Sequence, residues 1–594
     1  MQLVSWKHTL AIFLVAAFFA AIPYPYMYVK MGYQAPTIPV AAYTGEGGEY
    51  YFMRMEEIKD GYPLMGNPFF IEHREEISPA FFLADWFAAI PLLLGGSWMF
   101  TVIFNLFLWS FLFLLLVFLL MRILGLSSRW SIAGALLSYM EVCWLMARPV
   151  SMQVIFPFYI LFLIAFVLWL KDTQHHRKQA LLGFASALTA YLYTYAWQIV
   201  IVVLLLTPIH LFFAKRKNSL RAFVRVIVYF VTLSIPLILF TIRQIDQPFY
   251  LETMQRIGLI DTHLPTSASI EAGAWICALF ALGIFLYKKI YPYIDANERT
   301  TVIPFFVIVG LSMTAVMFSN IITGKDLELP QHIERFVVIW FALASVYLCS
   351  RLLRGEMSRN ISASTFVLGV LLIAVVSFGN IRYLINGGPG MMFSPAFDFT
   401  FYKQVQGFDV PLSWLRDNVK EQSVIWADPH GHINDYIVTQ SQHYVLFKAA
   451  GVLHIVSNKE LEERYLVANY FDLSEADLEN DYWSYGGVGN AVHQWKTENR
   501  RVRVCKILHL DYLGHPCGEL TDRVSWKGKS YFTELYQEYL DMVKPNIEDE
   551  LKKYHVSYAI RDNETDTPVF KPGTLAGARE IYTDGRFTIY KFEY

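Results

Sequence analysis

The sequence predicts a polytopic α-helical membrane protein of about eleven spans with a C-terminal α/β domain outside the membrane. Three observations lead to this prediction. Asp, Glu, Lys and Arg account for 48 residues of segment 1–390, or 12%, but for 52 residues of segment 391–594, or 25%, which is about the share found in soluble domains. Long apolar stretches occur only in the first segment. The basic residues of that segment concentrate on alternate loops.

This composition excludes several classes of protein. A soluble single-domain enzyme, a disordered chain and a fibrous protein would not combine 55% hydrophobic residues with so uneven a distribution of charge. The net charge of −2 gives no indication of nucleic acid as a partner. We therefore analyse the chain as two domains, a transmembrane domain at 1–390 and a second domain at 391–594.

Apolar stretches of sufficient length identify the spans, because a helix needs about 20 apolar residues to cross a bilayer. We expect spans at 8–29, 99–121, 131–147, 153–170, 179–195, 197–214, 222–242, 272–287, 302–320, 336–350 and 362–380. A further apolar stretch, 80–96, contains Asp85 and has prolines nearby. We interpret it as a re-entrant or interfacial segment that follows the first exterior loop, 30–79.

The basic residues set the orientation. With a cytoplasmic N-terminus, the inside loops hold Arg122, Arg129, Lys171, Arg177, Lys178, Lys215, Arg216, Lys217, Arg221, Lys288, Lys289, Arg299, Arg351, Arg354 and Arg359. The short outside connections hold far fewer, for example Arg148 alone between the third and fourth spans. This bias follows the positive-inside rule. We expect a plasma or inner cell membrane, a retained first span, and an extracytoplasmic C-terminal domain.

The C-terminal domain alternates strand-like and helix-like segments. "SVIWADP", "HYVLFKA", "HVSYAIRD" and "RFTIYKFEY" are rich in β-branched and aromatic residues and predict strands. "PLSWLRDNV" and "KSYFTELYQEYLDMVK" have helical spacing. "DYWSYGGVGN" at 481–490 is interpreted as a Gly-rich loop, and it lacks the residues of a phosphate-binding P-loop. Cys505 and Cys517 are either free or, if the domain is exported, joined in a disulfide.

The first exterior loop contains the first candidate for catalysis. Glu46 and Glu49 lie in a Gly-rich turn directly before a predicted helix, "EYYFMRMEEI". A carboxylate in such a turn can act as a general base on a hydroxyl. The alternative is a solvated acidic loop, or a favourable charge at a helix N-terminus.

Cationic residues cluster at other exterior positions. Lys325, His332 and Arg335 lie at or near the outer mouth of the tenth span, and His332 and Arg335 share a helix face. Cations at such a mouth can bind phosphate, or they can be interfacial side chains that reach toward water. Arg148 and Arg256 are further exterior basic residues. Together with the acidic loop, these residues outline a site for an anionic, lipid-linked substrate.

Two other carboxylates remain alternatives to the first-loop acid. Glu141 lies inside the third predicted span, and Asp85 lies in the segment 80–96. An ionisable residue within the membrane is a functional candidate, because burying its charge there is costly.

The first loop also resembles a known family. An acidic residue followed by "EYYFMRMEEIKDGYP", then "NPFF" and a Pro-led apolar segment, is similar to the first loop of GT-C glycosyltransferases. The likeness extends to oligosaccharyltransferase catalytic subunits, protein mannosyltransferases and aminoarabinose transferases. The resemblance implies a GT-C-like fold and an enzyme that takes a hexosyl or pentosyl group from a polyprenyl-phosphate-linked donor. The acceptor would be a glycan, a lipid or a protein. It also implies that Glu49, or its close rival Glu46, is catalytic.

The sequence departs from the oligosaccharyltransferase pattern in two places. The short loop "ARPVSMQ" has no acidic residue, and "DYWSYGG" only faintly matches a Trp-Trp-Asp-Tyr-Gly motif. We therefore expect an inverting enzyme that uses a monophosphate lipid and needs no metal, with a divalent metal as the alternative. Two other classes stay open, namely a lipid or sugar-lipid transporter and an assembly protein whose exported domain binds a partner.

Overall fold

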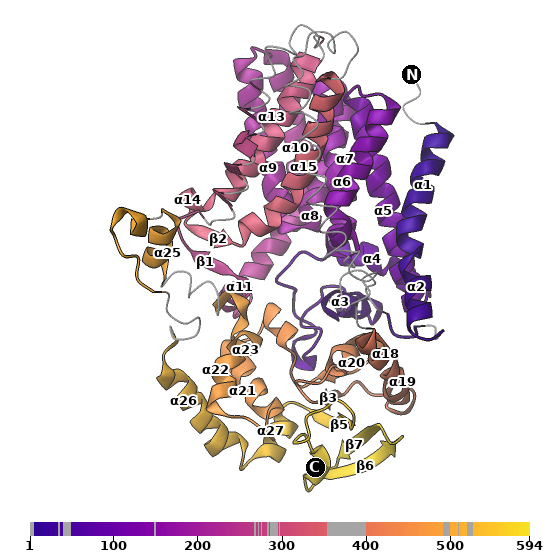
Figure 1. Cartoon of the computed structure of the whole chain (residues 1–594), viewed down its shortest axis with the longest axis vertical. Coiled ribbons are helices and arrows are strands. Elements are labelled where there is room, and N and C mark those ends of the chain that lie inside the picture. The colour runs from indigo at the N-terminus through magenta and orange to yellow at the C-terminus, as the bar shows by residue number, and fades with distance from the viewer. Residues whose placement is uncertain are drawn as a thin grey trace.

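The computed structural model describes residues 5–33, 36–39, 49–147, 150–265, 269–352, 399–490, 499–519 and 527–594, without 271–272, 275, 279, 282–283, 285–294, 296–297 and 509. A helical bundle forms one end of the molecule and an α/β domain forms the other (Figure 1). The first exterior loop fills the space between them, where α3 lies below the bundle and above the sheet (Figure 1).

The bundle consists of long apolar helices. They are α1 (Trp6–Ala21), α2 (Pro23–Lys30), α5 (Trp98–Ile123), α6 (Ser128–Ala147), α7 (Ser151–Lys171), α8 (His176–Leu192), α9 (Thr194–Phe213), α10 (Lys217–Ile245), α13 (Ile303–Met317) and α15 (Leu329–Leu352). Seven helical stretches among the described residues are long and apolar enough to cross a membrane. They correspond to the predicted spans 8–29, 99–121, 153–170, 197–214, 222–242, 302–320 and 336–350, which are confirmed as apolar helices.

The other predicted spans have different outcomes. Segments 131–147 and 179–195 are helical, as α6 and α8, but neither is among the seven. Half of segment 272–287, and all of 362–380, lies outside the described residues. Segment 80–96 forms α4 (Leu83–Leu93), and its 11 residues are too short for a bilayer core that needs about 20.

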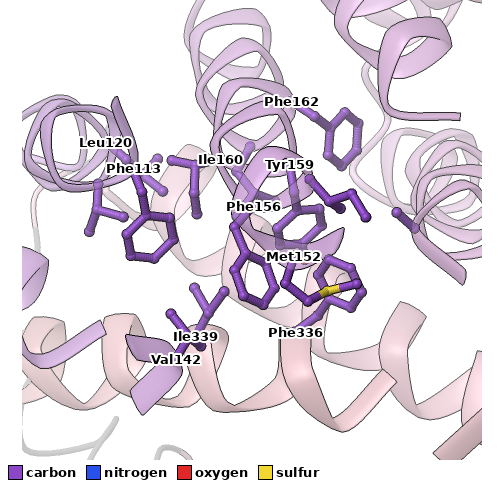
Figure 2. Packing of buried hydrophobic residues seen from close by; sticks show 14 of the residues in the cluster. Phe113, Leu120, Val142, Met152, Phe156, Tyr159, Ile160, Phe162, Phe336 and Ile339 are labelled. Carbon is purple, nitrogen blue, oxygen red and sulfur yellow. The ribbon is translucent and has the colours of Figure 1, made fainter. Parts of the chain in front are cut away.

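Apolar side chains hold the bundle together, with α7 at its centre. The Phe156 ring lies 6.0 Å from that of Phe113 on α5 and 5.7 Å from that of Phe336 on α15. The Tyr159 ring lies 4.7 Å from that of Phe336, and these side chains interdigitate with Met152 and Ile339 (Figure 2). By contrast, α10 exposes many large apolar side chains, such as Leu239. Helix α7 is therefore an interior helix, and α10 presents its outer face to lipid.

The C-terminal domain is built on a five-stranded mixed sheet of order β4-β3-β5-β7-β6. Its strands are β3 (Val424–Trp426), β4 (Tyr444–Val445), β5 (Val556–Asp562), β6 (Ala578–Thr583) and β7 (Phe587–Phe592). Strands β4, β3 and β5 run parallel, whereas β7 is antiparallel to both β5 and β6. The four predicted strands are confirmed. The sequence reading missed β6, which is half exposed along its length.

Short helices surround this sheet. They are α18 (Thr400–Gly407), α19 (Asp409–Asn418), α20 (Asn434–Gln440), α21 (Asn458–Ala468), α22 (Glu475–Asn480), α23 (Tyr482–Val488), α25 (Arg500–Ile507), α26 (Lys529–Glu538) and α27 (Ile547–Lys553). The prediction of a Gly-rich loop at 481–490 is wrong, because α23 occupies most of it. Tyr482 and Tyr485 are buried there, and the Tyr485 hydroxyl donates to the Leu478 carbonyl at 2.7 Å.

Segments between the long helices connect the two bodies. The first loop contains α3 (Glu49–Lys59) and the short 3-10 helix η1 (Ile71–His73), and the later loops contain α11 (Tyr250–Ile257) and α14 (Asn320–Thr323). Strand β1 (Leu259–Asp261) pairs with β2 (Lys325–Leu327), which joins loops 243–271 and 321–335. Phe69 and Phe70 of the "NPFF" segment are buried in the apolar core of the C-terminal domain. The first loop is thus part of that domain's core, while the predicted boundary at 390 lies outside the described residues.

Candidate functional site

Helix α3 is buried between the bundle and the C-terminal domain. Every residue from Phe52 to Ile58 is buried, although the sequence alternates apolar and charged side chains. Phe52 belongs to the core of the bundle, whereas Met53 belongs to the core of the C-terminal domain. Helix α3 packs on α4 at one side and on α20 at another. Its charged side chains therefore need partners from both bodies.

Arg54 and Asp85 form a buried ion pair between α3 and α4. The Arg54 Nε donates to Asp85 Oδ1 at 3.0 Å, and its Nη2 donates to Oδ2 at 2.8 Å. A third donor, Nη1, reaches the Tyr50 hydroxyl at 3.1 Å. Burial alone would lower the pKa of Arg54, but the charge of Asp85 outweighs it and raises that pKa. Asp85, an alternative acid in the sequence reading, thus serves to hold α3 against α4.

Two neighbouring carboxyl groups of α3, on Glu56 and Glu57, were missed as site candidates by the sequence reading. Burial raises the pKa of Glu56 to about 7 and that of Glu57 to about 8. Glu56 Oε1 accepts from Lys59 Nζ at 2.5 Å, while Oε2 of each carboxyl is buried without a hydrogen-bond partner among the described residues. A carboxyl with a pKa near 7 suits general acid–base work at neutral pH. Burial alone distinguishes the Glu56 and Glu57 carboxyl groups from those of a solvent-exposed acidic helix face.

A small cavity of mixed polar and apolar lining lies between α3 and the end of the bundle. It is lined by Tyr24, Phe52, Met55, Val102, Asn105, Leu106 and Gln153. The Tyr24 hydroxyl and Gln153 Oε1 are buried without a partner among the described residues, although buried polar atoms are normally satisfied. The cavity therefore offers unused polar groups to a water molecule between the first-loop helix and the bundle.

His332 and Arg335 meet at Tyr193, where α9 and α15 begin. The His332 ring stacks on that of Tyr195 at 4.0 Å and 5°, and its Nδ1 is hydrogen-bonded to the Tyr193 hydroxyl. Arg335 Nη1 donates to the same hydroxyl at 3.3 Å. Within the described part of the chain, no ion pair joins Arg335 to a carboxylate, whereas His332 Nε2 lies 3.4 Å from Glu328 Oε2. Both His332 and Arg335 are thus oriented by aromatic residues that the sequence analysis did not single out.

The first turns of α7 separate the cavity from this cationic cluster. Gln153 lines the cavity together with Phe52 of α3. Phe156, one turn further along α7, contacts Phe336 of α15, and the Phe336 ring lies 6.3 Å from that of Tyr193. The acidic first-loop helix and the cations therefore flank the same end of the bundle.

The remaining cationic candidates lie elsewhere. Lys325, in β2, is exposed and pairs with Asp261 of β1. Arg256 is fully buried, and its guanidinium donates to the carbonyl groups of Val452, His454 and Val456. Burial lowers the pKa of Arg256 to about 10. Arg256 therefore ties α11 to the C-terminal domain rather than facing a ligand.

The other predicted residues are placed as follows. Glu49 is the first residue of α3, and Glu141 is half-buried in α6. Glu46 and Arg148 lie outside the described residues. Among the residues that the structure describes, no group of three or more His, Cys, Asp or Glu side chains is arranged to hold a metal ion.

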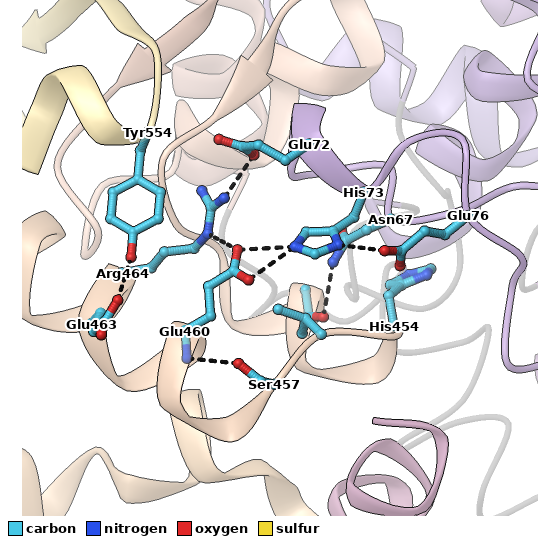
Figure 3. A network of polar contacts seen from close by, with 12 residues as sticks. Asn67, Glu72, His73, Glu76, His454, Ser457, Glu460, Glu463, Arg464 and Tyr554 are labelled. Atoms are coloured by element: carbon cyan, nitrogen blue, oxygen red, sulfur yellow. Dashed lines mark hydrogen bonds and ion pairs between the residues drawn. The ribbon is translucent and has the colours of Figure 1, made fainter. Parts of the chain in front are cut away.

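A charged network joins the first loop to α21 of the C-terminal domain (Figure 3). His73 bonds to Glu76 at 2.8 Å and to Glu460 at 3.0 Å. The fully buried Arg464 bonds to Glu460 at 2.9 Å and to Glu72 at 2.7 Å. Burial alone would lower the pKa of His73, but its bonds to Glu460 and Glu76 raise it to about 9. The network fixes the first loop, and with it α3, to the C-terminal domain.

Comparison with known proteins gives matches only among solved structures. The sequence matches no known family, and it matches no curated protein. The structure is similar to ArnT from Cupriavidus metallidurans bound to undecaprenyl phosphate, with 11% identity, a TM-score of 0.41, and 96% of this chain and 97% of that chain covered.

It is also similar to the archaeal oligosaccharyltransferase AglB from Archaeoglobus fulgidus in complex with an inhibitory peptide and a dolichol-phosphate. That match has 12% identity and a TM-score of 0.44, and covers 99% of this chain and 74% of that chain. The apo form of the Archaeoglobus fulgidus oligosaccharyltransferase matches with 12% identity and a TM-score of 0.45, and covers 98% of this chain and 74% of that chain.

Proposed function

We propose that the protein is an integral-membrane glycosyltransferase that moves a sugar from a polyprenyl-phosphate-linked donor to an extracytoplasmic acceptor. One observation carries the proposal. A buried, acidic first-loop helix and two oriented basic residues, His332 and Arg335, flank the same end of an apolar bundle. A donor with an apolar tail and an anionic phosphate needs lipid access for the tail, cations for the phosphate and a base for the acceptor.

The reaction we propose is a single inverting displacement. Glu49, or Glu46 before it, removes the proton from an acceptor hydroxyl, and the oxygen attacks the anomeric carbon of the sugar. The bond from that carbon to the phosphate oxygen breaks, and polyprenyl phosphate leaves with the electron pair. Glu49 opens α3. The buried carboxyl of Glu57, further along the same helix and with its pKa raised to about 8 by burial, is the second choice for the base. A general base of this kind contributes about 10²-fold or more in rate.

The leaving phosphate is proposed to bind at His332 and Arg335. Negative charge grows on that group as the bond breaks, so fixed cations stabilise the transition state more than the ground state. An arginine matches two phosphate oxygens at once, and Tyr193 holds Arg335 in place. Arg148 and Lys325 are proposed as further contributors, and a phosphate at Lys325 would replace Asp261 as its partner.

The orientation we propose places this end of the bundle outside the cytoplasm. The inside loops carry most of the basic residues, in line with the positive-inside rule. Cys505 and Cys517 form a disulfide in the C-terminal domain, which agrees with an oxidising compartment, because disulfides are rare in the cytosol. The chain would then expose its cationic cluster and first loop to an extracytoplasmic acceptor.

The decisive experiment measures release of polyprenyl phosphate from polyprenyl-phosphate sugars by the full-length protein in lipid nanodiscs. We expect the double variant Glu46→Gln/Glu49→Gln to reduce release by about 100-fold or more. Glu75→Gln, which changes an exposed carboxyl of the same loop, serves as the matched control and should leave release unchanged. Arg335→Gln should lower release strongly, whereas Arg243→Gln, an exposed cation at the end of α10, should not.

Other outcomes would redirect the assignment. Full release by the double variant, with loss in Glu57→Gln, would move the base to Glu57. Translocation of the labelled lipid without any sugar release would overturn the transferase and favour a transporter. A metal requirement is tested in the same assay by adding and removing a chelator.

A further inference from the structure

A disulfide-closed arm projects from the C-terminal domain, and the proposed reaction gives it no role. The arm comprises the described residues of 499–519, and contains α25 and the 3-10 helix η7 (Leu510–Leu513). Cys505 in α25 and Cys517 after η7 are joined, so the segment is closed on itself. Helix α25 packs on η7 of the same arm. In Figure 1 the arm stands out from the body of the molecule.

The tip of the arm presents large apolar side chains to its surroundings. The exposed fractions are 58% for Leu508, 86% for Tyr512 and 71% for Leu513. A tight turn holds Tyr512 and Leu513 there, because the backbone N–H of Gly514 donates to the Asp511 carbonyl at 3.1 Å with a φ of +85°. Contiguous exposed apolar groups of this kind mark an interaction site.

Helix α25 gives the arm a positive charge. The sequence of α25, RRVRVCKI, contains four basic residues and no acidic one. Arg500 and Lys506 are exposed at its two ends. An apolar tip beside a cluster of cations is the combination that binds an anionic lipid surface, where apolar groups enter the bilayer boundary and cations meet headgroup phosphates.

The position of the arm agrees with this partner. In Figure 1 α25 lies beside the lower end of the bundle, level along the long axis with α14 and the β1–β2 pair. Helix α14 follows directly after α13 and exposes Ile322, at 87%. The end of a spanning helix marks the surface of the bilayer, so the arm stands at the height of the headgroups, to one side of the spans.

We propose that the arm is a lateral membrane anchor that lies in the interface of an anionic bilayer, with Tyr512 and Leu513 on the hydrocarbon side of the headgroups and the exposed Arg500 and Lys506 of α25 near their phosphates. The anchor fixes the C-terminal domain relative to the membrane surface. The disulfide keeps the apolar tip and the basic helix on one rigid unit. The proposal does not depend on the identity of the reaction.

The test uses full-length protein in nanodiscs of phosphatidylcholine with or without phosphatidylglycerol. A fluorescent amino acid replaces Leu513 in one sample and Asp549 of α27, on the far side of the domain, in the other. Lipids with a quencher near the headgroup should quench the probe at 513 and not at 549. Quenching at 513 should be stronger with phosphatidylglycerol, and Arg500→Gln/Lys506→Gln should remove that difference.

Three results would overturn the anchor. No quenching at 513 in either disc would leave the arm in water and favour a protein partner. Equal quenching with and without phosphatidylglycerol would remove the anionic surface as the partner. Equal quenching at 513 and 549 would show that the arm lies no closer to the lipid than α27 does, which contradicts an anchor. The thermal unfolding curve of the Arg500→Gln/Lys506→Gln variant should match that of the parent protein. A loss of quenching in this variant then reflects the missing charges of the arm and not misfolding.

Discussion

The helical bundle and the interface beneath it are held together by different interactions. The bundle core is apolar and aromatic, and the rings of Phe156 and Tyr159 each pack edge-to-face with that of Phe336 (Figure 2). The interface between the first loop and the C-terminal domain contains buried charges. Arg464 pairs there with the carboxylates of Glu72 and Glu460 (Figure 3), and its guanidinium lies over the rings of Phe70 and Tyr554.

This difference shows which kind of interaction fixes the geometry of the site. An apolar contact tolerates rearrangement so long as volume is conserved. A buried charge does not, because an unpaired charge in the interior is strongly unfavourable. The buried ion pairs of Arg54 and Arg464 therefore determine how α3 lies between the two bodies, and the predictions below test that distinction.

The largest expected effect is at Arg464. Arg464→Met leaves the carboxylate of Glu72 without its partner and that of Glu460 with His73 alone, so we expect the C-terminal domain to lose about 3–5 kcal/mol of unfolding free energy. The control is Arg579→Met, whose exposed pair with Glu593 should contribute at most about 1 kcal/mol. Denaturant unfolding followed by tryptophan fluorescence measures both. Equal losses in the two variants would contradict the distinction.

The next effect compares one truncation in both regions. Phe69→Ala removes a fully buried ring from the core of the C-terminal domain and should lower the unfolding free energy by about 3–5 kcal/mol. Phe156→Ala in the bundle should lower it by less, because lipid is as apolar as the core and only packing is lost. A larger loss at Phe156, in the same unfolding assay, would show that the bundle is the more specific region.

A pH titration sharpens the role of His73. Its pKa rises from 6.5 to about 9 on folding, so its contribution is complete below pH 6.5 and is lost as the pH rises to 9, by up to about 3 kcal/mol. Glu57, whose pKa is raised to about 8, also lowers the unfolding free energy as the pH rises in this range. His73→Gln should therefore flatten the stability curve between pH 6.5 and 9 without removing all of its slope.

The control for that titration is His430→Gln. His430 is exposed, so its replacement should leave the curve of the parent protein unchanged. A parent curve that is already flat between pH 6.5 and 9 would contradict the assigned pairing of His73 with Glu460 and Glu76.

The smallest effect is expected at Lys325. Its pair with Asp261 is exposed on both sides, so Lys325→Ala should change the unfolding free energy by at most about 1 kcal/mol. Polyprenyl phosphate release should fall less than in Arg335→Gln, because Asp261 already neutralises part of the charge of Lys325. Thermal unfolding and the release assay together check this, and a large loss of stability would place Lys325 among the buried structural cations.

Sequence patterns predicted the elements better than their surroundings. The apolar helices and the four strands follow from local periodicity, and so does α3 at 49–59. The prediction at 481–490 was wrong because its glycines indicate a loop, whereas the burial of Tyr482 and Tyr485 favours helix. The sequence analysis did not select Glu56 and Glu57, because two neighbouring acidic residues show the same local pattern whether they are buried or exposed to solvent. Only tertiary contacts reveal their burial.

The sequence by itself determined the division into a membrane bundle and an α/β domain, since length, hydropathy and the distribution of charge act along the chain. Only the tertiary structure decided that Asp85 pairs with Arg54, that Arg256 binds carbonyl groups of the other domain, and that His332 and Arg335 meet at Tyr193. These pairings join residues far apart in the sequence. Whether a charge is free or buried with a partner depends on such contacts, and no local pattern encodes them.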